Sequence, residues 1–150
     1  MGERATMGVA SEAIKEAFVV AMEAALELGD LDKAGELLAI VDGLPPGRSP
    51  QFLPAQSARF RAQLAARRGD PEETERLFKQ AAGRFRELSV PFYLAVTELE
   101  NAEWLLAQER PHDAASLLAE AAEIFERLAA RPWLERLAAL SGQEVASLAP

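Results

Sequence analysis

The stretch "ARRGDPEETERLF" (Ala66–Phe78) decides the fold of this 150-residue chain, because it carries the signals that end one helix and begin another. Gly69 can adopt the left-handed backbone conformation that stops a helix, since it has no Cβ to clash. Asp70 is a typical N-cap residue, and Pro71 suits the first position of a helix. Glu73 completes the capping-box pattern that Asp70 opens. The stretch therefore predicts a tight turn between two helices.

The same turn recurs 40 residues earlier and 40 residues later. The stretches "ELGDLDKAGELL" (Glu27–Leu38) and "LAQERPHDAASLL" (Leu106–Leu118) align with it without gaps, so that Gly29, Gly69 and Glu109 correspond. A recurrence at one fixed interval is the signature of a helical repeat array. Because Glu109 replaces glycine, we expect the third turn to be less well capped.

The recurrence also decides how Arg68-Gly69-Asp70 is interpreted. On an exposed loop this tripeptide can be an adhesion ligand, which needs its carboxylate uncommitted. In the repeat, however, Gly69 matches the helix stop Gly29, and Asp70 matches the cap Asp30. We therefore interpret the tripeptide as a turn between helices.

Apolar residues recur at spacings of three and four residues, as they do on one face of a helix. One such series is Leu77, Phe78, Ala81, Phe85 and Leu88. No segment shows a sustained alternation of period two, so the chain is predicted to be all-α. Proline-containing stretches separate the helical segments. The predicted helices are 9–28, 31–42, 54–68, 71–88, 92–108, 111–129 and 133–147.

Small residues at the predicted helix crossings give the chain a resemblance to the tetratricopeptide-repeat (TPR) family, which also has a glycine–aspartate type of turn within each helix pair. The crossing positions here are Ala34, Val41, Ala62, Thr74, Ala81, Ala102, Ala114 and Ala121. The 40-residue period is longer than the family's usual repeat. The chain also departs from the family pattern at Met22, Arg61, Glu98 and Asn101. Its second half, Phe85–Leu140, is similar to the C-terminal repeat arrays of bacterial multidomain signalling proteins, which include nucleotide cyclases and ATPase-type transcriptional regulators.

The resemblance implies a right-handed superhelical array of antiparallel helix pairs. Such a TPR-like α-solenoid would contain about seven helices, in three pairs followed by a C-terminal capping helix. We expect residues 1–8 to be disordered and residues 9–148 to form a single domain. The implied repeats are 9–50, 51–90 and 91–131, with the capping helix at 132–148.

Composition limits the functions that this chain can have. A net charge of −8 argues against nucleic acid as a partner, because phosphate binding needs a cationic surface. The chain has no cysteine and a single histidine, His112, so the common zinc ligand sets are missing. We therefore expect no enzymatic activity, no cofactor and no metal.

Composition also bears on the compartment. The apolar runs are too short to cross a bilayer, and no N-terminal stretch resembles a signal peptide. The absence of cysteine fits a reducing interior, and the abundance of alanine and arginine is a bias we associate with GC-rich bacterial genomes. We expect a cytoplasmic bacterial protein with no membrane partner.

The TPR resemblance implies that the first helix of each pair lines a concave groove. Segment Arg48–Arg86 carries nine Lys/Arg and four Asp/Glu in an otherwise acidic chain, so a basic strip would lie between two acidic ones. The simpler interpretation is that these charges only solvate the surface. The predicted groove residues are Glu16, Val20, Glu23, Glu27, Gln56, Arg59, Phe60, Gln63, Arg67, Leu99, Glu100 and Glu103.

We therefore expect a protein–protein interaction module that binds a protein or peptide partner in bacterial signalling or regulation. The first alternative is a structural element whose terminal helix docks on another copy, or on another domain of a larger protein, with Trp133 as an exposed contact. The second is a helical enzyme or cofactor binder, for which the sequence shows no ligand set. The other aromatic residues at helical spacings are predicted to be core: Phe18, Phe60, Phe78, Phe85, Trp104 and Phe125.

Overall fold

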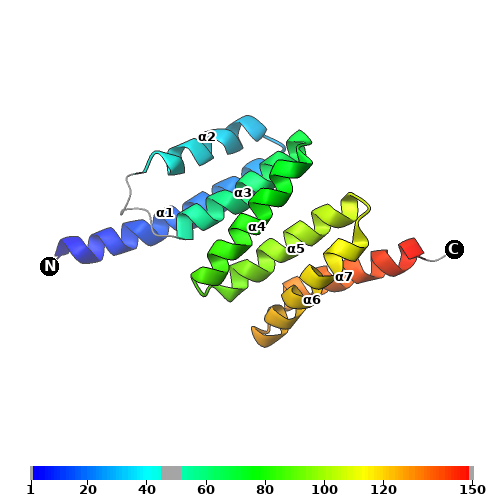
Figure 1. The fold of residues 1–150 in the computed structure, drawn as a ribbon. Coiled ribbons are helices and arrows are strands. Elements are labelled where there is room, and N and C mark those ends of the chain that lie inside the picture. The colour runs from blue at the N-terminus through cyan, green and yellow to red at the C-terminus, as the bar shows by residue number, and fades with distance from the viewer. Residues whose placement is uncertain (1, 45–51, 149–150) are drawn as a thin grey trace. The chain divides into compact units, whose positions relative to one another are not determined.

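The computed structural model describes the backbone of residues 2–44 and 52–148, and the side chains of residues 13–44 and 52–140. The described backbone forms seven helices and no strand, which confirms the all-α prediction (Figure 1). The chain divides into two compact units, Met1–Thr74 and Glu75–Pro150, where the sequence predicts one domain.

The helices follow the predicted pattern closely. All but the first begin within two residues of the predicted start. The exception, α1, begins at Gly2, so the backbone of residues 2–8 is helical where we expected disorder. Glu3, Arg4 and Ala5 are good helix formers, which favours this extension. The helices are α1 (Gly2–Glu27), α2 (Leu31–Asp42), α3 (Phe52–Arg68), α4 (Pro71–Glu87), α5 (Pro91–Ala107), α6 (Pro111–Arg127) and α7 (Arg131–Leu148).

Each short turn between helices is built around one residue in the left-handed conformation. At Gly69, with φ of +76°, the Asp70 amide donates to the Ala65 carbonyl oxygen (3.0 Å) and the Gly69 amide to that of Ala66 (3.2 Å). This pair of bonds is the Schellman motif, which satisfies the carbonyls at a helix end. The same two bonds recur at the turns centred on Gly29, Ser89, Glu109 and Ala129.

The prediction of a less well capped third turn holds at the start of α6, where Arg110 makes no side-chain cap bond. It is wrong at the end of α5, because Glu109 makes the same backbone bonds there as glycine. Its cost is conformational instead, since Glu109 holds a φ of +60° with a Cβ present. The left-handed residues Gly69, Ser89, Glu109 and Ala129 are spaced 20 residues apart, which is half the interval that the sequence reveals.

Aspartate caps the helices that follow the glycine turns. The Asp30 carboxylate accepts the Lys33 amide (3.1 Å), and the Asp70 carboxylate accepts the Glu73 amide (3.2 Å). Both predicted N-caps are confirmed. Because the Asp70 side chain is committed to the cap, the structure supports reading Arg68-Gly69-Asp70 as a turn.

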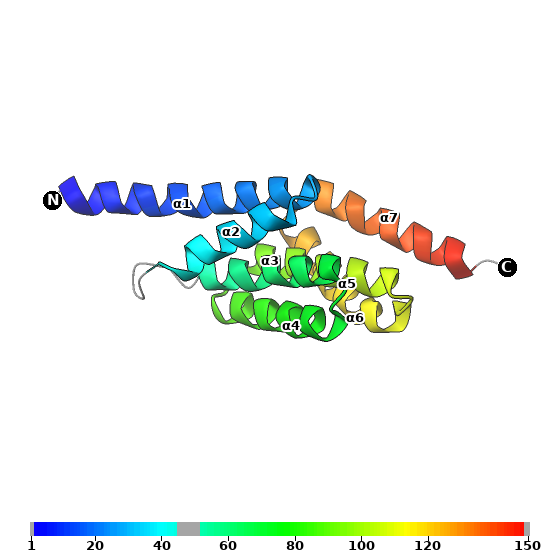
Figure 2. The same cartoon turned by 90° about the horizontal axis from the view of Figure 1, so that it is seen from above.

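The first unit has a core between its first three helices. Figure 2 shows α2 and α3 on the same side of α1, and both contact it. Phe18 of α1 meets Phe60 of α3 edge to face, with ring centroids 5.7 Å apart. Met22 and Leu38 are buried in the same core. One side of α1 is therefore fixed by packing.

Aromatic contacts join successive helices of the second unit. Phe85 of α4 stacks on Tyr93 of α5 (5.6 Å), and Phe125 of α6 stacks on Trp133 of α7 (5.5 Å). Phe92 contacts both Phe125 and Trp133. Of the six aromatic residues predicted to be core, Trp104 is half-buried and the other five are buried. The predicted crossing positions are all buried: Ala34, Val41, Ala62, Thr74, Ala81, Ala102, Ala114 and Ala121.

Candidate partner-binding surface on the first helix

The structure separates the predicted groove residues by exposure. Nine of the twelve belong to the first unit, and the last three to the second. The exposed ones are Glu16, Val20, Glu23, Glu27 and Arg67. The half-buried ones are Gln63, Glu100 and Glu103. The buried ones are Gln56, Arg59, Phe60 and Leu99, which lie in the interior. The exposed predicted residues therefore concentrate on α1.

Arg59 is an internal arginine rather than a surface one, with only 2% of its area exposed. Its Nη1 donates to the Gln56 Oε1 (3.0 Å), and its Nη2 lies 3.7 Å from the Glu23 Oε1. The guanidinium also lies over the Phe60 ring, 4.6 Å from the centroid. The contact with Glu23 joins α3 to α1, whereas Gln56 and Phe60 hold the guanidinium within α3. Arg59 is therefore buried and does not itself line a basic strip.

The face of α1 that points away from this core carries several apolar residues between Ala13 and Ala24. Successive residues turn by about 100° around a helix, which places Phe18 and Met22 on one side and Val20 on the other. Val20 is 65% exposed and Ile14 is 49% exposed. Small exposed residues continue the same strip. We define the apolar stripe as Ala13, Ile14, Ala17, Val20 and Ala24, in which Ile14 lies one turn before Phe18 and so forms the border toward the core.

Three glutamates run along one edge of this stripe. Glu16, Glu23 and Glu27 are all exposed and lie at intervals of seven and four residues, which places them in one row on a helix. We define them as the glutamate row. The Glu23 carboxylate lies near the buried Arg59 guanidinium, whereas the described residues place no buried cation beside Glu16 or Glu27. The row gives the apolar stripe one strongly negative border.

The apolar stripe is also unusual within this chain. The large apolar residues that are exposed in the described part of the chain are Ile14, Val20, Leu28, Ile40 and Leu128. Two of them lie on the stripe, and Leu28 follows directly after α1. Exposed apolar area that is grouped on one face is typical of an interaction site, whereas isolated apolar residues need no explanation.

In the second unit, the predicted groove residue Glu103 forms an ion pair with another helix of the same unit. The Arg136 Nε donates to the Glu103 Oε2 (3.0 Å), which joins α7 to α5. The same guanidinium lies over the Trp133 ring, 5.3 Å from the centroid. Trp133 packs within the second unit, so the structure gives no support to its use as an exposed docking contact.

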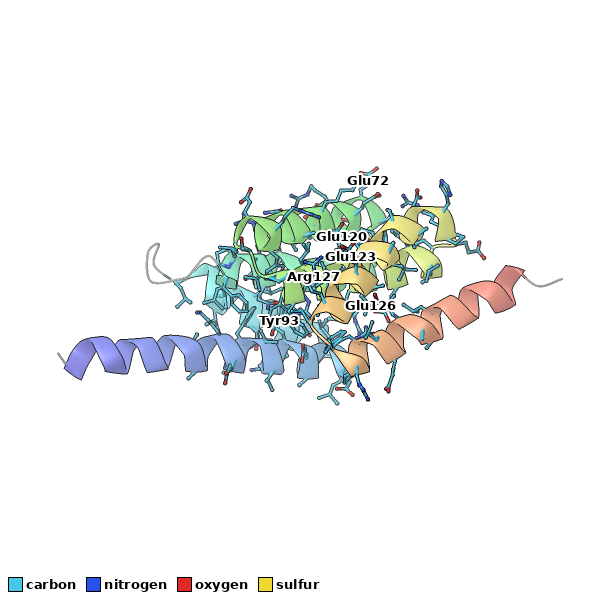
Figure 3. The ribbon with its side chains drawn as sticks, turned by 90° about the horizontal axis from the view of Figure 1, so that it is seen from below. Glu72, Tyr93, Glu120, Glu123, Glu126 and Arg127 are labelled. Carbon is cyan, nitrogen blue, oxygen red and sulfur yellow. The ribbon has the colours of Figure 1, made fainter. Side chains whose placement is uncertain are left out.

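A buried carboxyl group lies elsewhere in the second unit, where the sequence shows only a departure from the TPR pattern. The Glu98 Oε1 lies 3.3 Å from the Arg86 Nη2, which is also 3.0 Å from the Glu120 Oε1. Burial and the nearby Glu120 carboxylate raise the pKa of Glu98 to about 8, against the opposing effect of Arg86. Figure 3 shows Glu120 on α6 beside Glu123.

Two buried acceptor oxygens lie close together in the sequence of α5, the Glu98 Oε2 and the Asn101 Oδ1. Neither accepts a hydrogen bond from the described residues. No group of three or more His, Asp or Glu side chains is arranged to hold a metal within the described residues. We interpret the Glu98 cluster as a structural acid, which the sequence misses because three different helices create it.

Comparisons of this chain with protein-family models, with curated proteins and with solved structures found no match. Among the described residues, no helix is both long enough and apolar enough to cross a membrane.

Proposed function

We propose that this chain is a non-enzymatic protein–protein interaction module that binds a peptide or a partner domain on the exposed face of α1. The observation that carries the proposal is the apolar stripe with its glutamate row. Covering exposed apolar area on binding is favourable, and a charged border selects the orientation and charge of the partner. We place the module in bacterial cytoplasmic signalling or regulation, within a TPR-like array, in line with the sequence resemblance.

The interior supports the proposal because it holds α1 rigidly behind this face. Phe18 packs against Phe60, and the Arg59 guanidinium reaches across to Glu23. A surface that is fixed before binding loses less conformational entropy when a partner arrives. The predicted groove residues Gln56, Arg59 and Phe60 thus take part in the proposal as scaffold.

The non-enzymatic part of the proposal rests on composition. The chain has no cysteine, and its one histidine, His112, is exposed in the first turn of α6. General acid–base and nucleophilic catalysis need several oriented groups around one substrate position. The exposed face of α1 offers aliphatic side chains and carboxylates, which suit recognition better than chemistry.

Site-specific photo-crosslinking tests the proposal directly. A photoreactive amino acid replaces Val20 in one variant and Ile40 in a matched control, because the two residues are 65% and 64% exposed and lie in the same unit. We expect a discrete adduct with a cellular protein from position 20 and none from position 40. Identical adduct patterns at both positions, or no adduct at position 20, would contradict the proposal.

A further inference from the structure

We infer that the partner presents a basic amphipathic helix to α1, with its apolar side chains on the apolar stripe and its lysines or arginines along the glutamate row. The inference rests on the proposed function and names the chemistry of the partner. It follows from three properties of the surface: the backbone of α1, the size of the stripe residues, and the spacing of the glutamates.

The backbone of α1 favours a helical partner over an extended one. An extended peptide gains much of its affinity by pairing its backbone with the edge of a sheet. A helix such as α1 offers no such edge, because its own N–H and C=O groups bond to one another. A partner helix satisfies its backbone internally and needs to contribute side chains only.

The small residues of the stripe permit close packing of that helix. Ala13, Ala17 and Ala24 are exposed and lie around Val20. Helices pack with their axes about 8–10 Å apart, at the short end of this range when small residues line the contact. Val20 then acts as the projecting apolar contact in an otherwise low surface, and Ile14 adds apolar area at the border toward the core.

The glutamate row sets the charge of the partner. From Glu16 to Glu27 the row extends for about 16 Å, at about 1.5 Å per residue. A partner helix with cations at similar intervals of seven and four residues can meet this row along its full length. Glu23 is partly balanced by Arg59, so Glu16 and Glu27 present most of the unbalanced charge.

A second copy of this chain fits the surface less well. Each copy carries a net charge of −8, so two copies repel one another. In an antiparallel pairing of two α1 helices, the two glutamate rows would also lie face to face. The charge therefore favours a foreign basic helix.

Fluorescence anisotropy with designed peptides tests the inference on the full chain. The probe is a labelled amphipathic peptide of about 18 residues, with a leucine and alanine face bordered by lysines at the matching spacing. A second peptide carries glutamate in place of each lysine. We expect the lysine peptide to bind at least about tenfold more tightly than the glutamate peptide, with an affinity that falls as salt is added.

Two variants of the chain locate the binding of the lysine peptide. Val20→Asp and the double variant Glu16→Lys/Glu27→Lys should each weaken it at least about tenfold. Glu23 is left unchanged, because replacing it would remove the partner of buried Arg59. The matched controls are Ile40→Asp for the apolar change and Glu87→Lys/Glu126→Lys for the charge change, since all three residues are exposed. The controls should bind the lysine peptide as the unaltered chain does.

Four outcomes would overturn the inference. They are equal binding of the two peptides, no binding of the lysine peptide at about 1 mM, equal losses in the control variants, and light scattering that shows a dimer dissociated by Val20→Asp. If the crosslink from position 20 forms but the lysine peptide fails, the inference about a basic helix is lost and the proposed function stands. If neither is seen, both are lost.

Discussion

Three residues with side chains hold a backbone conformation that glycine adopts without cost. Ser89, Glu109 and Ala129 have φ values of +55°, +60° and +53°, and each supports the same Schellman hydrogen bonds as Gly69. A left-handed residue with a Cβ costs about 1–2 kcal/mol. The turns of the second unit therefore carry conformational strain that the glycine turns of the first unit avoid.

Ala129→Gly should accordingly raise the free energy of unfolding by about 1 kcal/mol, because glycine relieves the left-handed strain. Urea denaturation followed by circular dichroism measures the change. The matched control is Ala119→Gly in α6, which is exposed in a regular helix and should lower stability by about 1 kcal/mol. A loss of stability in Ala129→Gly would show that the turn does not hold this conformation.

Glu98 should make the stability of the chain depend on pH, because its pKa is raised from 4.5 to about 8 in the folded chain. Between these values the folded state keeps a proton that the unfolded state releases. Stability should therefore fall as pH rises from about 4.5 to about 8, by at most about 1.4 kcal/mol per pH unit, and level off above that range.

Glu98→Gln mimics the protonated acid and should remove this part of the pH dependence, while raising stability at pH 8. Urea titrations at several pH values measure both effects. Glu120→Gln is the informative comparison, since removing the neighbouring carboxylate should lower the pKa of Glu98 and move the fall in stability to lower pH. An unchanged pH profile in Glu98→Gln would rule out a raised pKa.

At the scale of elements, the sequence predicts helices well because their boundaries are set locally. Asp70 caps its own helix and Gly69 ends the one before, so neighbouring residues suffice to place the turn. The 20-residue interval is hard to recognise in the sequence, because Ser89 and Ala129 lack the glycine of the other turns and are followed only by Pro91 and Pro132.

The candidate site was less predictable because burial depends on which helices meet. The TPR resemblance predicts Arg59 and Leu99 in the groove, whereas both lie in the interior. Arg59 could be recognised only once Glu23 and Phe60 were known to surround it. The TPR resemblance also predicts Glu16, Val20, Glu23 and Glu27 in the groove, and these four side chains are exposed. Their role in binding stays a prediction.

The two faces of α1 should respond to substitution in opposite ways. Met22→Ala on the buried face should lower the free energy of unfolding by about 2–5 kcal/mol, since Met22 has no exposed area. Val20→Asp on the apolar stripe should change it by no more than about 0.5 kcal/mol. Thermal and urea unfolding of both variants measure this difference. Equal losses would mean that the stripe is part of the core.

At the scale of the whole molecule, the acidic net charge and the apolar stripe contribute to the proposed binding in different ways. The net charge of −8 keeps copies of the chain apart and attracts cationic partners over a distance set by the salt concentration. The apolar stripe then supplies short-range free energy on contact. Stability resides in the interior, whereas the proposed recognition uses the outer face of α1, so we expect that each can be altered separately.

The central claim is tested most directly by quantitative capture of cellular proteins on three forms of the full chain: unaltered, Val20→Asp and Ile40→Asp. Mass spectrometry measures the amount of each captured protein. We expect a partner that is captured by the unaltered chain and by Ile40→Asp and is lost from Val20→Asp, with the helical content of all three unchanged. A set of captured proteins that is the same for Val20→Asp as for the unaltered chain would contradict it.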